Sequence, residues 1–161
     1  MFEPFDKSEG DGAFLQAAAA LADVPDKGSL IDVLGPVSNI IALLNWYLED
    51  INWVGVYLLD GDRLVLGPFQ GLPACETIPV GRGVCGTAAT AAETVAVGDV
   101  HRFPGHIACD GASESEIVAP VFNPQGKLVG VLDVDSPVRD RFSEKHKEFF
   151  SAAAGIIGRL F

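Results

Sequence analysis

Residues 116–135 read EIVAPVFNPQGKLVGVLDVD, two apolar runs separated by a turn. Val, Ile and Leu dominate both runs, and β-branched residues of this kind favour strands. The four residues between the runs, 123–126 (NPQG), are typical turn formers. The segment therefore predicts a β-hairpin with strands over residues 116–122 and 127–135.

Acidic side chains mark the end of this hairpin that lies away from the turn. Asp133 and Asp135 share a face because strand side chains alternate, and a symmetric turn places Glu116 opposite Asp133. A bulge at Gly126 would instead place Val134 opposite Glu116. Converging carboxylates can bind a cation or hold a proton through mutual repulsion. A solvated strand end is the ordinary alternative, but the valines that precede Asp133 on the same face favour a pocket.

The rest of the chain places helices at both termini around a run of strands. The patterns favour helices at 13–22, 29–48, 84–92 and 143–160, strands at 52–59, 63–70 and 94–97, and loops at 71–83 and 98–115. Within the second helical pattern, we expect Pro36 to start a new helix. This order predicts an α+β fold with a mostly antiparallel sheet, as one domain over residues 1–161 with an N-terminal extension over 1–25.

Composition narrows the range of functions. Eleven Lys and Arg against 22 Asp and Glu give a formal net charge of -11, which disfavours nucleic acid and anionic membranes as partners. No stretch approaches the roughly 20 apolar residues that span a bilayer. The N-terminus lacks the basic region of a signal peptide, so we expect a cytoplasmic protein.

Three cysteines, Cys75, Cys85 and Cys109, lie in segments rich in Gly, Pro, His or Asp rather than in apolar runs. In a reducing cytosol an odd set of three favours transient, catalytic disulfides over a structural framework. Cys85 falls in the first turn of a predicted helix next to Arg82, where a thiolate would be stabilised. A small residue packed in a tight turn explains Cys85 equally well.

Cys109 lies in the long loop at 98–115, and loops of this length are usually functional. His101 and His106 share the loop, and either could orient or protonate a substrate. These two histidines and Cys109, with Cys75 or Cys85 added, could instead bind zinc. The closely spaced cysteine pairs of structural zinc sites are missing, which makes zinc the weaker alternative.

Six strings in one order carry a resemblance to a known family: INWVGVYLL (51–59), GPFQGLPAC (67–75), GRGVCGTA (81–88), DVHRFPGHIACD (99–110), SEIVAP (115–120) and GVLDVDSP (130–137). Together they resemble the free methionine-(R)-sulfoxide reductases, single-domain enzymes of the GAF fold. The resemblance runs from Ile51 to about Phe142. It implies a central, mostly antiparallel sheet of about five to six strands, with the N- and C-terminal helices packed on one side.

The resemblance also implies a role for each cysteine. Cys109 matches the cysteine that attacks the sulfoxide sulfur and becomes a sulfenic acid. Cys85 matches the main resolving cysteine, which would close a disulfide with Cys109, and Cys75 matches an auxiliary one. Thioredoxin or a similar dithiol would then restore the thiols, with no metal or organic cofactor.

Substrate binding follows from the same resemblance. Glu116, Asp133 and Asp135 match carboxylates that line the pocket, and Trp53 and Tyr57, which share a strand face, would cover the methionine side chain. The carboxylates would bind the ammonium group of free methionine sulfoxide. A homodimer is compatible with the resemblance and with the apolar segment 37–48. A non-enzymatic GAF sensor of small ligands or oxidants is the alternative.

Overall fold

The computed structural model describes residues 3–24, 29–107 and 109–161. Part of the expected N-terminal extension, residues 1, 2 and 25, and Ala108 of the cysteine loop lie outside these ranges. The elements in chain order are η1 (Lys7–Glu9), α1 (Asp11–Ala22), α2 (Leu30–Tyr47), β1 (Trp53–Asp60), β2 (Arg63–Gln70), β3 (Thr77–Pro79), α3 (Gly83–Ala91), β4 (Val95–Val97), η2 (Val100–Arg102), β5 (Ser115–Phe122), β6 (Leu128–Ser136) and α4 (Glu144–Gly158).

Six strands form one antiparallel sheet in the order β3-β2-β1-β6-β5-β4. The predicted α+β class and the hairpin at 53–70 are confirmed, with β1 and β2 joined by a turn at Gly61. The edge strand β3 lies in the segment expected to be a loop. Its three residues, Thr77–Pro79, are too few to show an alternating pattern between the neighbouring glycines and prolines.

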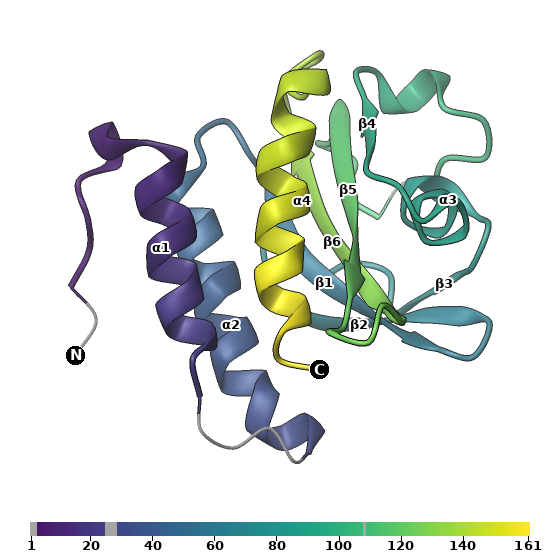
Figure 1. Cartoon of the computed structure of the whole chain (residues 1–161). Coiled ribbons are helices and arrows are strands. Elements are labelled where there is room, and N and C mark those ends of the chain that lie inside the picture. Colours follow the sequence, from purple (N-terminus) through teal and green to yellow (C-terminus); the bar gives the residue numbers. More distant parts are fainter. Residues whose placement is uncertain (1–2, 25–28, 108) are drawn as a thin grey trace.

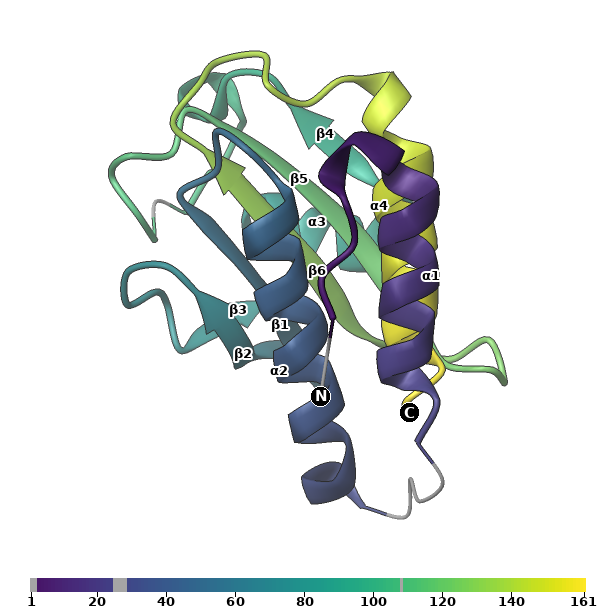
Figure 2. The ribbon, with the colours of Figure 1, turned by 90° about the vertical axis from the view of Figure 1, so that its left-hand side faces the viewer.

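The two faces of the sheet carry separate apolar clusters. Helices α2 and α4 cover one face, with α1 packed on both of them, while α3 and the segment after β4 lie on the other face (Figures 1 and 2). Strand β1 shows the alternation: Val54 and Val56 pack toward the three helices, and Trp53 and Tyr57 pack toward α3. The candidate site lies on the α3 face.

Helix α2 runs without a break through Pro36, so the expected new helix at that residue is wrong. A capping box between Ser29 and Asp32 starts the helix. Val33 and Val37 are buried on either side of the proline, and this packing offsets the hydrogen bond that proline cannot make. Contrary to the expectation that no stretch is apolar enough to span a bilayer, α2 is long and apolar enough by length and composition alone, with a mean hydropathy of 1.3. One of its faces nevertheless packs in the core.

The register of the β5–β6 hairpin differs from both expected alternatives. Glu116 pairs with Asp135, and Asp133 pairs with Val118. Gly126 adopts a φ of 77°, and a second irregularity between Val121 and Phe122 moves the register by one further residue. Two shifts of one residue restore the original facing, so the carboxylates still share one face of the sheet.

Two glycines of α4 give a matched test of its packing against β5. A methyl group at Gly158 would collide with the backbone carbonyl of Phe122, whereas nothing lies within 4 Å of one at Gly155. We expect Gly158→Ala to lower the free energy of unfolding by about 2 kcal/mol through overpacking. Gly155→Ala should raise it by about 0.5–1 kcal/mol, because alanine favours helix. Urea unfolding measures both, and equal effects would contradict this packing.

Candidate active site

Three carboxylates converge at one end of the sheet, on the face toward α3. Glu116 lies on β5, and Asp133 and Asp135 lie on β6, directly beside it. Alternation along β6 puts Asp133 in line with Val131, a core residue of this face. Glu116 and Asp133 are each only 6% exposed. The acids therefore continue an apolar stripe into the interior, as the sequence pattern indicated.

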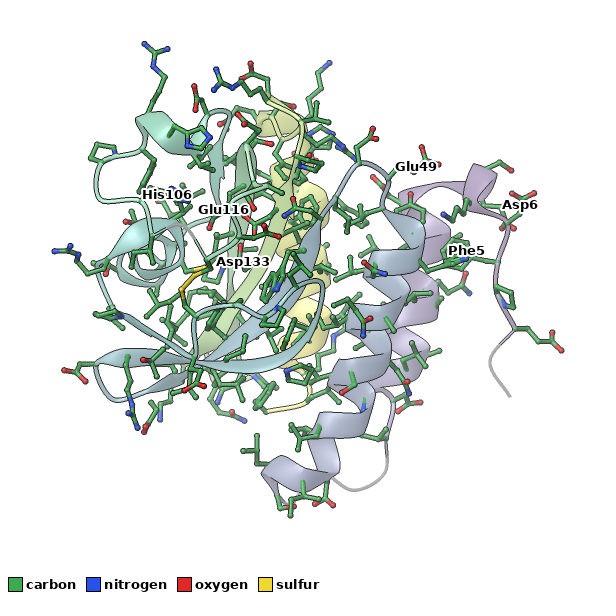
Figure 3. The ribbon with its side chains drawn as sticks, turned by 180° about the vertical axis from the view of Figure 1, so that it is seen from behind. Phe5, Asp6, Glu49, His106, Glu116 and Asp133 are labelled. Atoms are coloured by element: carbon green, nitrogen blue, oxygen red, sulfur yellow. A yellow bond between two sulfur atoms is a disulfide. The ribbon has the colours of Figure 1, made fainter. Side chains whose placement is uncertain are left out.

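A cavity of about 30 Å³ lies over these carboxylates. The first turn of α3 contributes Cys85 to its wall, and the loop after η2 contributes His106 and Cys109. Figure 3 shows His106, Glu116 and Asp133 together beside the disulfide. This volume holds one or two water molecules. The site thus joins thiol chemistry to a buried group of acids.

Cys75 and Cys109 form a disulfide with their Cα atoms 5.4 Å apart. The bond in this structure is therefore not the Cys85–Cys109 bond that the resemblance implies for the reaction. Cys75 lies in the segment before β3, which brings it to the loop of Cys109 although 34 residues separate them in sequence. Cys85 is a free thiol, and its side chain is buried where α3 packs on the sheet.

The Cys85 thiol is buried, and its Sγ lies 3.8 Å from Glu116 Oε1. Burial raises the pKa of this thiol well above its ordinary value, and the nearby Asp133 and Glu116 raise it further. The expected stabilisation of a Cys85 thiolate by Arg82 and the helix N-terminus is therefore not observed. Burial disfavours the thiolate, and the Arg82 side chain is exposed to solvent. Of the two interpretations of Cys85 in the sequence, the packed thiol is the one observed.

Burial also governs protonation of the acids. It raises the pKa of Glu116 well above the ordinary value, with further increases from Asp133 and Asp135. Burial likewise raises the pKa of Asp135, and that of Asp133 to about 6. Like charges in one buried site cannot all ionise at neutral pH. The site thus holds at least one proton that it can donate.

The two loop histidines occupy different surroundings. His106 Nε2 lies 3.9 Å from Glu116 Oε2, and burial lowers the pKa of its imidazole. His101 is half-exposed and lies 3.5 Å from Glu114, outside the cavity. The zinc set considered from the sequence does not assemble in this form, because Cys109 is bonded to Cys75 and His101 lies elsewhere.

The aromatic residues expected over the substrate lie deeper than the cavity. Trp53 and Tyr57 are each 1% exposed and stack with ring centroids 5.9 Å apart. Tyr57 donates a hydrogen bond to the backbone oxygen of Cys75 at 3.1 Å. The pair shares the acidic face of the sheet without lining the cavity of this disulfide form, and Tyr57 supports the segment that carries Cys75.

Asn52 is a site residue that the sequence analysis missed. Its Nδ2 donates hydrogen bonds to Asp110 Oδ2 at 2.9 Å and to Ser113 Oγ at 3.1 Å. These bonds tie the start of β1 to the loop directly after Cys109. A polar residue before an apolar strand was the one available signal, and it is too common to indicate a role.

Comparison with known proteins places this arrangement in a family. The GAF domain family matches residues 38–160. The free methionine-R-sulfoxide reductase of Escherichia coli (strain K12) is 54% identical over 115 residues, which cover 71% of this chain and 69% of that protein. The chain belongs to the GAF-domain free methionine-R-sulfoxide reductases. The resemblance found in the sequence is thereby confirmed.

Solved structures agree with this membership in the free methionine-R-sulfoxide reductase family. The X-ray structure of the free methionine-R-sulfoxide reductase from Neisseria meningitidis in complex with its substrate has a TM-score of 0.85 and 40% identity, covering 100% of this chain and 93% of that one. The structure of fRMsr of Staphylococcus aureus in its reduced form has a TM-score of 0.82 and 46% identity, covering 99% and 97%.

Burying Asp133 should make stability depend on pH. Its folded pKa of about 6 lies above the ordinary 3.8, so its contribution to stability is full below pH 4 and is lost as pH rises through 6. Asp133→Asn removes the ionisation, and we expect it to raise the free energy of unfolding by about 1 kcal/mol more at pH 8 than at pH 5. Urea unfolding at both values measures this, and an equal gain at both would contradict the buried charge.

Proposed function

We propose that this chain reduces free methionine (R)-sulfoxide to methionine at Cys109. One observation carries the proposal: the Cys75–Cys109 disulfide borders a cavity lined by Glu116, Asp133 and Asp135, of which the first two are buried. The reduced Cys75 and Cys109 thiols supply two electrons when they close to this disulfide, and a buried acid supplies a proton. The relatives named for this activity support the choice of substrate. The (R) preference rests on those names alone.

In the first step the Cys109 thiolate of the reduced enzyme attacks the sulfoxide sulfur. Glu116, protonated through burial, donates a proton to the sulfoxide oxygen. The oxygen passes to Cys109 as a sulfenic acid, and methionine leaves with the electron pair. Glu116 is the proposed proton donor because its Oε2 lies 3.9 Å from Nε2 of His106, which belongs to the loop that carries Cys109. Cys85 contacts the other oxygen of Glu116 and keeps it in place.

In the second step the Cys75 thiol condenses with the Cys109 sulfenic acid, forming the disulfide and releasing water. Here Cys75 takes the resolving role that the resemblance assigned to Cys85. An external dithiol, with thioredoxin as the proposed donor, then reduces the disulfide by exchange. Each cycle turns one sulfoxide and one dithiol into methionine, water and a disulfide, with no metal or organic cofactor. A reducing cytoplasm would supply such a donor.

Recognition of the free amino acid follows from the charge of the pocket. The ammonium group of free methionine sulfoxide can pair with Asp133 and Asp135, whereas a residue inside a peptide lacks this charge. Among the described residues that line the cavity, none is Lys or Arg, so no side chain already neutralises these acids as an ion pair. Trp53 and Tyr57 are proposed to contact the methionine side chain once reduction frees the Cys75 segment.

The outer face of α2 is the surface that we propose for a homodimer. Ile31, Leu34 and Trp46 lie within one side of this helix and are 79%, 39% and 40% exposed. An apolar groove of about 370 Å³ adjoins Trp46. A second copy of the chain would bury this uncharged stripe against its own, and sedimentation at several concentrations detects the association.

An activity assay tests the substrate class. With dithiothreitol present, we expect the enzyme to release methionine from free racemic methionine sulfoxide. N-acetylmethionine sulfoxide should give about 100-fold lower kcat/KM, because leaving a buried carboxylate without its partner costs about 3 kcal/mol. Chromatography measures the products. If neither compound is reduced while the free sulfoxide still binds, the chain is a GAF sensor rather than an enzyme.

Cysteine variants test the proposed roles. Cys109→Ser should release no methionine, because it lacks the attacking sulfur. Cys75→Ser should release about one equivalent and then fail to recycle with thioredoxin, whereas Cys85→Ser should still recycle. Single-turnover and steady-state assays separate these cases. Recycling by Cys75→Ser but not by Cys85→Ser would reverse the two roles.

A further inference from the structure

We propose that Cys85, Glu116 and Asp133 form a binding site for a thiophilic divalent cation such as Zn²⁺. One ligand atom from each residue, the Cys85 Sγ and a carboxylate oxygen of each acid, lies within 4.8 Å of the other two. All three residues are buried. The site does not depend on the proposed reaction, since its ligands exist in the disulfide form, which cannot turn over.

The ligand spacing suits zinc. With Zn–S near 2.3 Å and Zn–O near 2.1 Å, neighbouring ligands of a tetrahedral ion lie about 3.4–3.6 Å apart. Cys85 Sγ and Glu116 Oε1 are already 3.8 Å apart. Closing the set around an ion therefore needs movements of about 1 Å or less, which rotation of the two carboxylates can supply.

An unpartnered polar atom points to a missing ligand. Asp133 is 6% exposed, and its Oδ1 is buried without a hydrogen-bond partner. An unsatisfied buried carboxylate oxygen is costly, and a bound cation would satisfy it. The cavity above it has about 30 Å³, enough for an ion with one bound water.

The surroundings supply the remaining coordination. His106 Nε2 lies 3.9 Å from Glu116 Oε2, so its imidazole can take the fourth position, or water can. On binding, the Cys85 thiol releases its proton and the sulfur coordinates the ion as a thiolate. A cation bound here would occupy the place proposed for the substrate ammonium, so zinc and substrate would compete.

A second group of potential ligands serves as a matched control. Asp99, His101 and Glu114 also gather within 4.8 Å, but on the surface. Arg139 already fills that group, with contacts of 3.3 Å to Asp99 and 2.7 Å to Glu114. The Arg139 guanidinium lies where an ion would bind, so this cluster is an ion-pair network. We therefore expect His101→Ala to leave metal binding at the buried site unchanged.

The test uses the protein with its Cys75–Cys109 disulfide intact, so that Cys85 is the only thiol. Titration with Co²⁺ should give a thiolate-to-cobalt charge-transfer band that saturates at one equivalent, and Zn²⁺ should abolish it by displacement. Cys85→Ser should remove the band, and Asp133→Asn should weaken binding by about tenfold or more. His101→Ala should leave both band and affinity unchanged.

Three results would overturn the site: no charge-transfer band in the wild type, a band that survives Cys85→Ser, or loss of the band in His101→Ala. Circular dichroism and cooperative thermal unfolding show whether each variant is folded. Because the readout is binding to a form that cannot turn over, its failure leaves the proposed reductase activity untouched. Failure of the sulfoxide assay likewise leaves this site standing.

Discussion

A group of three carboxylates, two of them buried, on an otherwise apolar sheet face determines the chemistry of the site. Two of them, Glu116 and Asp133, are almost fully removed from water, and their mutual repulsion prevents complete ionisation. Burying these acids lowers the free energy of unfolding of the domain. In return these acids hold at least one proton and lie directly beneath the Cys75–Cys109 disulfide.

Each neighbouring element keeps this group in place. The central hairpin β5–β6 sets the acids side by side, the first turn of α3 seals them with Cys85, and the disulfide fixes the loop of Cys109 above them. Hydrogen bonds from Asn52 to Asp110 and Ser113 hold the part of that loop directly after Cys109. The helices on the opposite face make a separate core, so the site and the main packing of the domain lie on different faces of the sheet.

Strong periodic patterns made much of this fold predictable, and local irregularities limited the rest. The runs around Gly61 and residues 123–126 identified four central strands, and the alternation of valine and acid along β6 predicted the pocket. The exact register was not predictable, because two single-residue shifts near Phe122 depend on backbone geometry rather than on composition. Pro36 was misread because tertiary packing outweighed a local helix breaker. The partner of Cys109 depends on where the connection between β2 and β3 lies relative to the Cys109 loop, which no local pattern encodes.

Mapping the disulfide formed in one turnover shows whether Cys109 reacts and Cys75 resolves beside the buried acids. Fully reduced protein is mixed with free methionine sulfoxide, quenched in denaturant with an alkylating agent, and digested for mass spectrometry. We expect a peptide pair joined through Cys75 and Cys109, with the alkyl group on Cys85. A bond between Cys85 and Cys109, with Cys75 alkylated, would contradict these roles.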